Sequence, residues 1–255
     1  MDNWVGLAAL FISAMIEGAI NSVAGGGTLI SFPTLIAFGI SSIQANATNT
    51  AALWPGSLSS AYAYSHDIKP DRKMVLMLLV PSMVGGLLGA LALVATPPEL
   101  FSHIVPFLVL FATVLFASRP VLDRLFKREG DAEDVSSVGK VWGFLFQLFV
   151  ATYGGYFGAG IGILMLGSMS IMGFRDIHRM NGLKTILGTL INFIAFLFFA
   201  WRGLVIWNLA ILMTIGAIVG GYFGARFAKR IDQRMLRAFI IIVGVVVSVY
   251  LFFKA

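Results

Sequence analysis

Long stretches without Asp, Glu, Lys or Arg constrain this chain more than any other feature. Only 12% of its 255 residues are charged, against about 25% in a soluble domain. A helix needs about 20 apolar residues to cross a bilayer. Uncharged stretches near or above this length are residues 24–65, 74–98, 100–118, 141–174, 203–225 and 238–253. They are continuously apolar, whereas the strands of a membrane β-barrel alternate apolar and polar residues. The chain is therefore predicted to be an all-α polytopic membrane protein.

Three consecutive glycines interrupt the first apolar region. Residues 4–43 carry one charge, Glu17, and as one helix they would be about 60 Å long, twice the hydrocarbon thickness of about 30 Å. Each glycine costs a helix about 1 kcal/mol relative to alanine. The chain is therefore expected to fold back at Gly25-Gly26-Gly27, with helices over 4–23 and 28–39.

The same pattern returns 135 residues later. Residues 141–174 would form a helix of about 51 Å, and its expected break lies at the glycines of 158–162. The residue pairs that match at this offset are Gly25 with Gly160, Gly27 with Gly162, Asn46 with Asn181, Thr50 with Thr185, and Val84-Gly85-Gly86 with Val219-Gly220-Gly221. Internal duplication explains these matches better than chance.

Each repeat is expected to hold a glycine-broken hairpin and three transmembrane helices. This amounts to about eight hydropathy spans and up to ten helical segments. The expected division is a first repeat over 1–118, a cytoplasmic linker over 119–137 and a second repeat over 138–255. Further helices are expected over 42–65, 74–95, 100–118, 177–201, 203–227 and 235–253. Basic residues from Arg119 predict a helical extension, followed by a flexible acidic segment over 129–134.

The distribution of Lys and Arg predicts the orientation. Of 18 such residues, 15 lie in segments 66–73, 119–140, 175–179 and 226–237, which the positive-inside rule places in the cytoplasm. Both termini are then extracytoplasmic, and equivalent helices run in opposite directions. The repeats are thus predicted to be inverted, as in many secondary transporters. The net charge of +6 indicates orientation rather than nucleic-acid binding. Whether each hairpin crosses fully or re-enters is left open.

The two breaks are candidate anion sites. A helix that restarts after a break presents free N–H groups and a positive dipole end, which bind anions without Lys or Arg. Close helix packing by small residues is the alternative. Packing is the favoured interpretation for Gly85-Gly86-x-x-Gly89 and Gly220-Gly221-x-x-Gly224, which lack polar neighbours in their helices. The polar neighbours of the first break favour binding there, and they are Asn21 and Thr28.

Polar side chains are dense at the start of the helix over 42–65. Asn46, Asn49 and Thr50 are three or four residues apart and share a helix face. Their equivalents in the second half are Asn181, Lys184 and Thr185. These groups are candidates for hydrogen bonds to a substrate, and interhelical hydrogen bonding is the alternative.

Two charged residues fall inside apolar segments. Lys184 is expected to face an interior cavity, where it would attract an anion or pair with Glu17, although snorkelling to the surface is an alternative. Glu17 lies one turn before Asn21. A buried carboxyl group could carry a proton, so Glu17 is a candidate for proton coupling; a structural ion pair or a neutral hydrogen-bonded acid is the alternative.

No enzymatic chemistry is indicated. The chain has no cysteine, which excludes disulfides and thiolate metal sites, and the three histidines form no metal-ligand spacing. Motifs of metalloproteases, serine hydrolases and P-loop ATPases are absent from the sequence. We therefore expect no catalytic residue, no metal and no cofactor.

The motifs resemble those of a known family. Asn21-Ser22-Val23-Ala24-Gly25-Gly26-Gly27-Thr28-Leu29-Ile30-Ser31-Phe32-Pro33 and Ala45-Asn46-Ala47-Thr48-Asn49-Thr50 resemble the first-repeat signature of the sulfite exporter TauE/SafE family. Tyr156-Phe157-Gly158-Ala159-Gly160-Ile161-Gly162 and Asn181-Gly182-Leu183-Lys184-Thr185 are similar to its second. The resemblance implies a multi-pass permease of the bacterial inner membrane that moves sulfur-containing anions such as sulfite or organosulfonates.

Together these features predict a secondary transporter that works by alternating access. Its substrate site is expected between Gly25–Thr28 and Gly160–Gly162, near the membrane midplane. The expected partners are a small anion and the lipid bilayer, without nucleic acid, and a homodimer is left open. Alternative functions are a passive anion channel, a transporter of another small carboxylate or oxyanion, and a membrane scaffold without transport activity.

Overall fold

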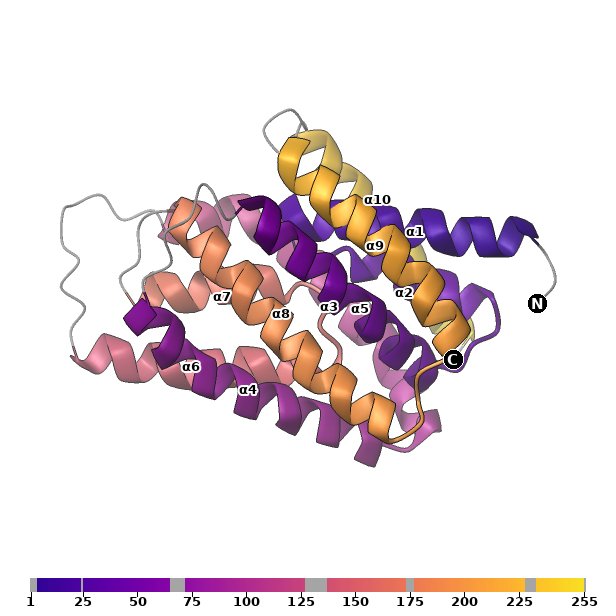
Figure 1. Cartoon of the computed structure of the whole chain (residues 1–255), viewed down its shortest axis with the longest axis horizontal. Coiled ribbons are helices and arrows are strands. Elements are labelled where there is room, and N and C mark those ends of the chain that lie inside the picture. The colour runs from indigo at the N-terminus through magenta and orange to yellow at the C-terminus, as the bar shows by residue number, and fades with distance from the viewer. Residues whose placement is uncertain are drawn as a thin grey trace.

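A computed structural model of the chain describes residues 4–23, 25–64, 72–126, 137–172, 177–227 and 233–254. Within these residues the chain is all helical and has no strand (Figure 1). The helices are α1 (Trp4–Val23), α2 (Thr28–Ala37), α3 (Ser42–Tyr64), α4 (Arg72–Ala95), α5 (Pro98–Phe126), α6 (Ser137–Tyr156), α7 (Ile161–Ile171), α8 (Ile177–Trp201), α9 (Trp207–Phe227) and α10 (Gln233–Lys254).

The prediction of a polytopic α-helical membrane protein is confirmed. In the part of the chain that the structure describes, six helices are long and apolar enough to cross a membrane: α1, α4, α5, α8, α9 and α10. The predicted extension of the 100–118 helix is also confirmed, because α5 continues to Phe126. The acidic segment over 129–134 lies outside the described residues.

Two short helices follow the two breaks. α2 has 10 residues and α7 has 11, so each is about 15–17 Å long, half the thickness of the hydrocarbon core. Neither can cross a bilayer alone. α2 ends before the predicted residue 39, because Gly39 adopts a left-handed φ of 80° and closes the helix. The amide of Ile40 then donates back to the carbonyl of Leu35.

Left-handed glycines produce both breaks. The φ angle is 72° at Gly25, 84° at Gly158 and 78° at Gly160, values that other residues rarely adopt. α7 therefore restarts at Ile161, directly after Gly160. The sequence had placed Gly162 in the break. In the structure it lies in the first turn of α7.

The helices pack as two bundles that mix the sequence halves. α1 packs against α9, and α6 packs against α4. α3 contacts α9 and α8, while α8 also contacts α4. Figure 1 shows α4 and α6 along one side of the molecule, with α3 and α8 nearer its centre. At the 135-residue offset, the α1–α9 pair corresponds to the α6–α4 pair. This pairing is what two equivalent halves require, and the inversion of the repeats stays a prediction.

The predicted role of the two glycine motifs in packing is confirmed. A side chain on Gly85 or Gly89 would collide with α6, at Leu148, Ala151 and Thr152. On the other side, Gly220 and Gly224 face Met15 and Ala19 of α1 with equally little space. Small residues thus let each helix pair approach backbone to backbone.

Candidate anion-binding pocket

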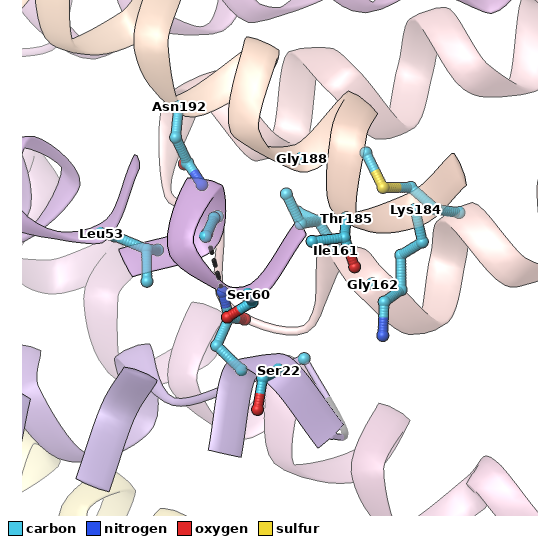
Figure 2. A pocket seen from close by; sticks show the side chains of 14 residues that line it. Ser22, Leu53, Ser60, Ile161, Gly162, Lys184, Thr185, Gly188 and Asn192 are labelled. Carbon is cyan, nitrogen blue, oxygen red and sulfur yellow. Dashed lines mark hydrogen bonds between the residues drawn. The ribbon is translucent and has the colours of Figure 1, made fainter. Parts of the chain in front are cut away.

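A pocket lies between α1, α3, α7 and α8, where the two breaks meet. A methyl group placed on Gly25 would lie 3.3 Å from Cα of Gly162, so the prediction that the breaks face each other is confirmed. The pocket combines apolar side chains with one amine and several hydroxyl and amide groups; its polar lining residues are Asn21, Ser22, Ser57, Ser60, Lys184, Thr185 and Asn192 (Figure 2).

Lys184 is the charged group of this pocket. Its side chain is 5% exposed, which is against the snorkelling alternative. The side chain extends past Gly162 (Figure 2). A methyl group on Gly162 would lie 3.1 Å from Cδ of Lys184, and one on Gly25 would lie 3.9 Å from Nζ. Both glycines therefore leave space for the Lys184 side chain.

The start of α7 points its backbone at the same pocket. Gly162 lines the pocket, and among the described residues its amide N–H donates to no backbone oxygen. The N-cap of α7 is Gly160, which has no side chain that could accept from the Gly162 amide. A helix N-terminus of this kind carries a partial positive charge. It adds to the charge of Lys184 on the same side of the pocket.

Sequence reasoning missed Ser57 and Asn192, which a simple periodicity would have found. Stepping by four along α3 from Asn49 gives Leu53 and Ser57, and the same step along α8 from Lys184 gives Gly188 and Asn192. All of these except Asn49 line the pocket. The two rows are also related by the 135-residue offset, so either signal leads to both residues. Ser57 accepts a hydrogen bond of 3.2 Å from the Asn21 amide.

The structure places part of the predicted site elsewhere. Asn46 donates to the backbone carbonyl of Tyr156 in α6, and Thr50 donates to the carbonyl of Asn46. Asn49 donates to Glu17. The bonds of Asn46 and Asn49 follow the interhelical alternative, whereas that of Thr50 stays within α3. Of the predicted residues, the pocket lining includes Asn21, Gly25, Gly162, Lys184 and Thr185, and does not include Gly26, Gly27, Thr28, Asn46, Asn49, Thr50 and Gly160.

Glu17 does not pair with Lys184, which was one of the alternatives that the sequence left open. Among the described residues, the hydrogen bonds to its carboxyl group come from Asn49 at 2.8 Å and Thr28 at 3.3 Å. Gly27 packs directly on the Glu17 backbone. The N-terminus of α2 therefore faces a carboxyl group of the chain itself, whereas the N-terminus of α7 faces the pocket.

The side chain of Asn181 is outside the described part of the structure. Among the residues that the structure describes, no group of three or more His, Cys, Asp or Glu side chains could hold a metal ion.

Comparisons with known proteins agree with this architecture. Residues 10–251 match the family model described as "Sulfite exporter TauE/SafE". The chain is 30% identical over 251 residues to "Probable membrane transporter protein ORF9" of Sinorhizobium sp., covering 96% of this chain and 92% of that protein. It is 29% identical over 254 residues to "Probable membrane transporter protein YfcA" of Escherichia coli, covering 98% and 90% of the two chains. A "Probable membrane transporter protein" of Haemophilus influenzae is 25% identical over 240 residues, with 93% and 91% covered. No solved structure matches the chain.

Proposed function

Since the chain belongs to the sulfite exporter TauE/SafE family of membrane transporters, we propose that it carries small sulfur-containing anions across the bacterial inner membrane. The substrates of this proposal are sulfite and short organosulfonates. Both present a compact, negatively charged group of sulfur-bound oxygens, which needs a cation and several hydrogen-bond donors.

One observation carries the proposal: a buried amine meets a helix N-terminus inside a pocket. Lys184 is 5% exposed, and Gly162 of α7 borders the same space. An oxyanion in the pocket would be attracted both by the Lys184 ammonium group and by the positive end of the α7 dipole.

The remaining walls match an organosulfonate. Hydroxyl and amide donors come from Ser57 and Asn192, and an apolar wall comes from Leu53 and Met165. The donors would bind the oxygens while the apolar wall would contact a short hydrocarbon substituent. This division of the lining supports a substrate with a charged head and a small organic body.

Alternating access is part of the proposal. The half-length helix α7 forms one wall of the pocket, and such discontinuous helices are common in secondary transporters. A tilt of α2 or α7 against the long helices would open the pocket toward one side of the membrane. Tilting of the other short helix would then open the pocket toward the opposite side and release the substrate.

Lys184→Met tests the site. We expect binding of methanesulfonate and of sulfite by purified protein to weaken about 30-fold or more, because the anion loses its buried charge partner. Arg202→Met is the matched control, since Arg202 is an exposed cation that lies over Trp201, away from the pocket. Equal affinities of the two variants, measured calorimetrically, would contradict the assignment.

Counterflow separates a carrier from a channel. Proteoliposomes loaded with unlabelled methanesulfonate should accumulate labelled substrate transiently, because a carrier exchanges one molecule for another. A passive channel would equilibrate the label without this overshoot. Non-saturable flux without counterflow would contradict alternating access while leaving the pocket assignment intact.

A further inference from the structure

Glu17 lies in a second polar cluster, behind the first break as seen from the pocket. Its side chain is fully buried, as are Ser31 and, at 1% exposure, Asn49. Oε1 of Glu17 accepts hydrogen bonds from Nδ2 of Asn49 and Oγ1 of Thr28. The Ser31 hydroxyl lies beside the same carboxyl group. Three helices, α1, α2 and α3, therefore contribute to the cluster.

The other half of this cluster consists of oxygens without partners. Within the described residues, Oε2 of Glu17 and Oδ1 of Asn49 are buried without a hydrogen bond, and the Ser31 hydroxyl approaches the Glu17 carboxyl group without reaching good hydrogen-bond geometry. Only the Ser31 hydroxyl carries a hydrogen, and it can serve one neighbour. A buried carboxylate that faces oxygens on one side is strongly unfavourable. One positive charge near Oε2 would remove this cost.

The surrounding helices do not provide that charge. The helices packed against α1 are α2, α3 and α9. α2 and α3 contain no Asp, Glu, Lys, Arg or His, and the tyrosines of α3 lie in its last turn, at 62 and 64. α9 carries Tyr222 and Arg226 near its end, where Arg226 is exposed and donates a hydrogen bond to the half-buried Tyr222. Lys184 lies across the break, beside Gly25.

A proton or a sodium ion would satisfy the cluster. A proton on Oε2 would leave Oε1 as the carbonyl oxygen that accepts two hydrogen bonds, and the new O–H would donate to a free oxygen. A sodium ion would instead take these oxygens as ligands, since hard cations prefer oxygen. Asn46, one turn before Asn49, has a further unpartnered and buried Oδ1.

The break connects this cluster to the pocket within three residues. Gly27 packs on the Glu17 backbone, whereas Gly25 borders Lys184 and lines the pocket. Asn49, which contacts Glu17, corresponds to Lys184 at the 135-residue offset. A negative charge on Glu17 would repel an anion in the pocket, and neutralising it would favour that anion.

We propose that the Glu17 cluster takes up one positive charge, as a proton on Oε2 or as a sodium ion, and that this uptake promotes anion binding in the neighbouring pocket. The first part stands on the cluster alone. The second part rests on the proposed transport function. The protein would then move its anion together with the cation, by symport.

The first experiment uses the full-length protein in detergent without any anion substrate. The infrared difference spectrum between the wild-type protein and the Glu17→Gln variant isolates the C=O stretch of a protonated Glu17. Gln is neutral and can donate where the proton would, so the variant is expected to fold. Glu99→Gln, at an exposed carboxyl group in the first turn of α5, is the matched control. Unfolding temperatures of all variants verify the fold.

The outcomes distinguish the two cations. A band that disappears as pH rises and is unaffected by sodium chloride indicates a proton. Sodium binding is indicated if sodium chloride, but not choline chloride, removes the band or raises the unfolding temperature. Glu17→Gln should abolish this sodium effect, and Ser31→Ala should weaken it. The proposal is overturned by a band that is constant at every pH and sodium concentration. Absence of both the band and the sodium effect overturns it as well.

The second experiment addresses the coupling. The substrate is methanesulfonate, whose charge is constant over this pH range. An inward proton or sodium gradient should stimulate its uptake into proteoliposomes that contain wild-type protein. Glu17→Gln should abolish this stimulation. Saturable uptake that ignores both gradients would overturn the coupling while leaving the transport function. Absence of any uptake with a normal infrared titration would instead contradict the proposed function.

Discussion

A buried amine and a buried carboxyl group lie on opposite sides of the first break, and neither neutralises the other. Lys184 borders Gly25, while Glu17 borders Gly27 and bonds to Asn49 and Thr28. At the residue scale, the difference between the two halves is one of charge. Position 49 offers an amide to a carboxyl group of the chain, and position 184 offers an ammonium group to the pocket.

Gly188 gives a prediction that separates stability from binding. It lines the pocket in the middle of α8, and a methyl group there would meet nothing within 4 Å. We expect Gly188→Ala to raise the stability of α8 by up to about 1 kcal/mol, seen as a higher unfolding temperature. The same methyl group should narrow the pocket, so affinity for a longer organosulfonate should fall more than affinity for sulfite. Unchanged affinity for both would show that substrate does not reach Gly188.

The site was only partly predictable at this scale. Lys184 and Gly162 were found because a charge or a glycine inside an apolar helix is rare, and such residues are visible without a fold. Ser57 and Asn192 were missed because lone Ser and Asn residues are common in helices, and only their alignment with position 184 distinguishes them. For Glu17 the sequence left open proton coupling, an ion pair and a hydrogen-bonded acid, and the structure shows hydrogen bonds from Asn49 and Thr28 rather than an ion pair with Lys184.

At the scale of elements, the two short helices differ in what their N-termini face. α2 begins against Glu17, and α7 begins against the pocket. Both follow left-handed glycines, at Gly25 and Gly160. A shared break thus produces one internally satisfied helix end and one available to a ligand.

The packing of α9 on α1 gives a second prediction. Gly220 touches the backbone of Met15, so the two helices are as close as their main chains allow. Gly220→Val should force them apart and destabilise the protein by about 1–3 kcal/mol. The unfolding temperature in detergent should fall accordingly. Gly188→Ala is the control for a helical glycine with free space, and equal unfolding temperatures would contradict the packing role.

Most helix bounds were predictable, because charged loops and glycine breaks mark where apolar runs must stop. The start of α9 was wrong by four residues, at Trp207 instead of 203. Gly203, with a φ of 68°, ends α8 instead, and the amide of Ile206 donates to Thr48. A tertiary hydrogen bond to α3 holds this turn open, and local sequence does not reveal it.

At the scale of the whole molecule, the two sequence halves interlock. α1 packs on α9, and α4 packs on α6, so each half supplies a helix to the bundle of the other. The glycine faces of α4 and α9 are useful only with that partner. The groups that face each other across the pocket, on α3 and α8, likewise come from different halves.

Separate expression of the halves tests this interlocking. We expect residues 1–118 alone and residues 138–255 alone to be degraded, because α1, α4, α6 and α9 each lose their main packing partner. Coexpression of both should restore a complex that can be purified through a tag on one half. Stable accumulation of either half alone, with helical content and cooperative unfolding, would contradict the expectation.

The α1–α9 contact also has a consequence for biosynthesis. From Val23 to Trp207 the ribosome must add 184 residues, which takes roughly 10–40 s at typical elongation rates. During this interval the nascent α1 is in the membrane with its surface for α9 uncovered and with a carboxyl group, Glu17, in its apolar stretch. The membrane insertion machinery or the short helix α2 must shield that surface until translation reaches α9. Newly made chains are therefore most exposed to membrane proteases before the ninth helix is inserted.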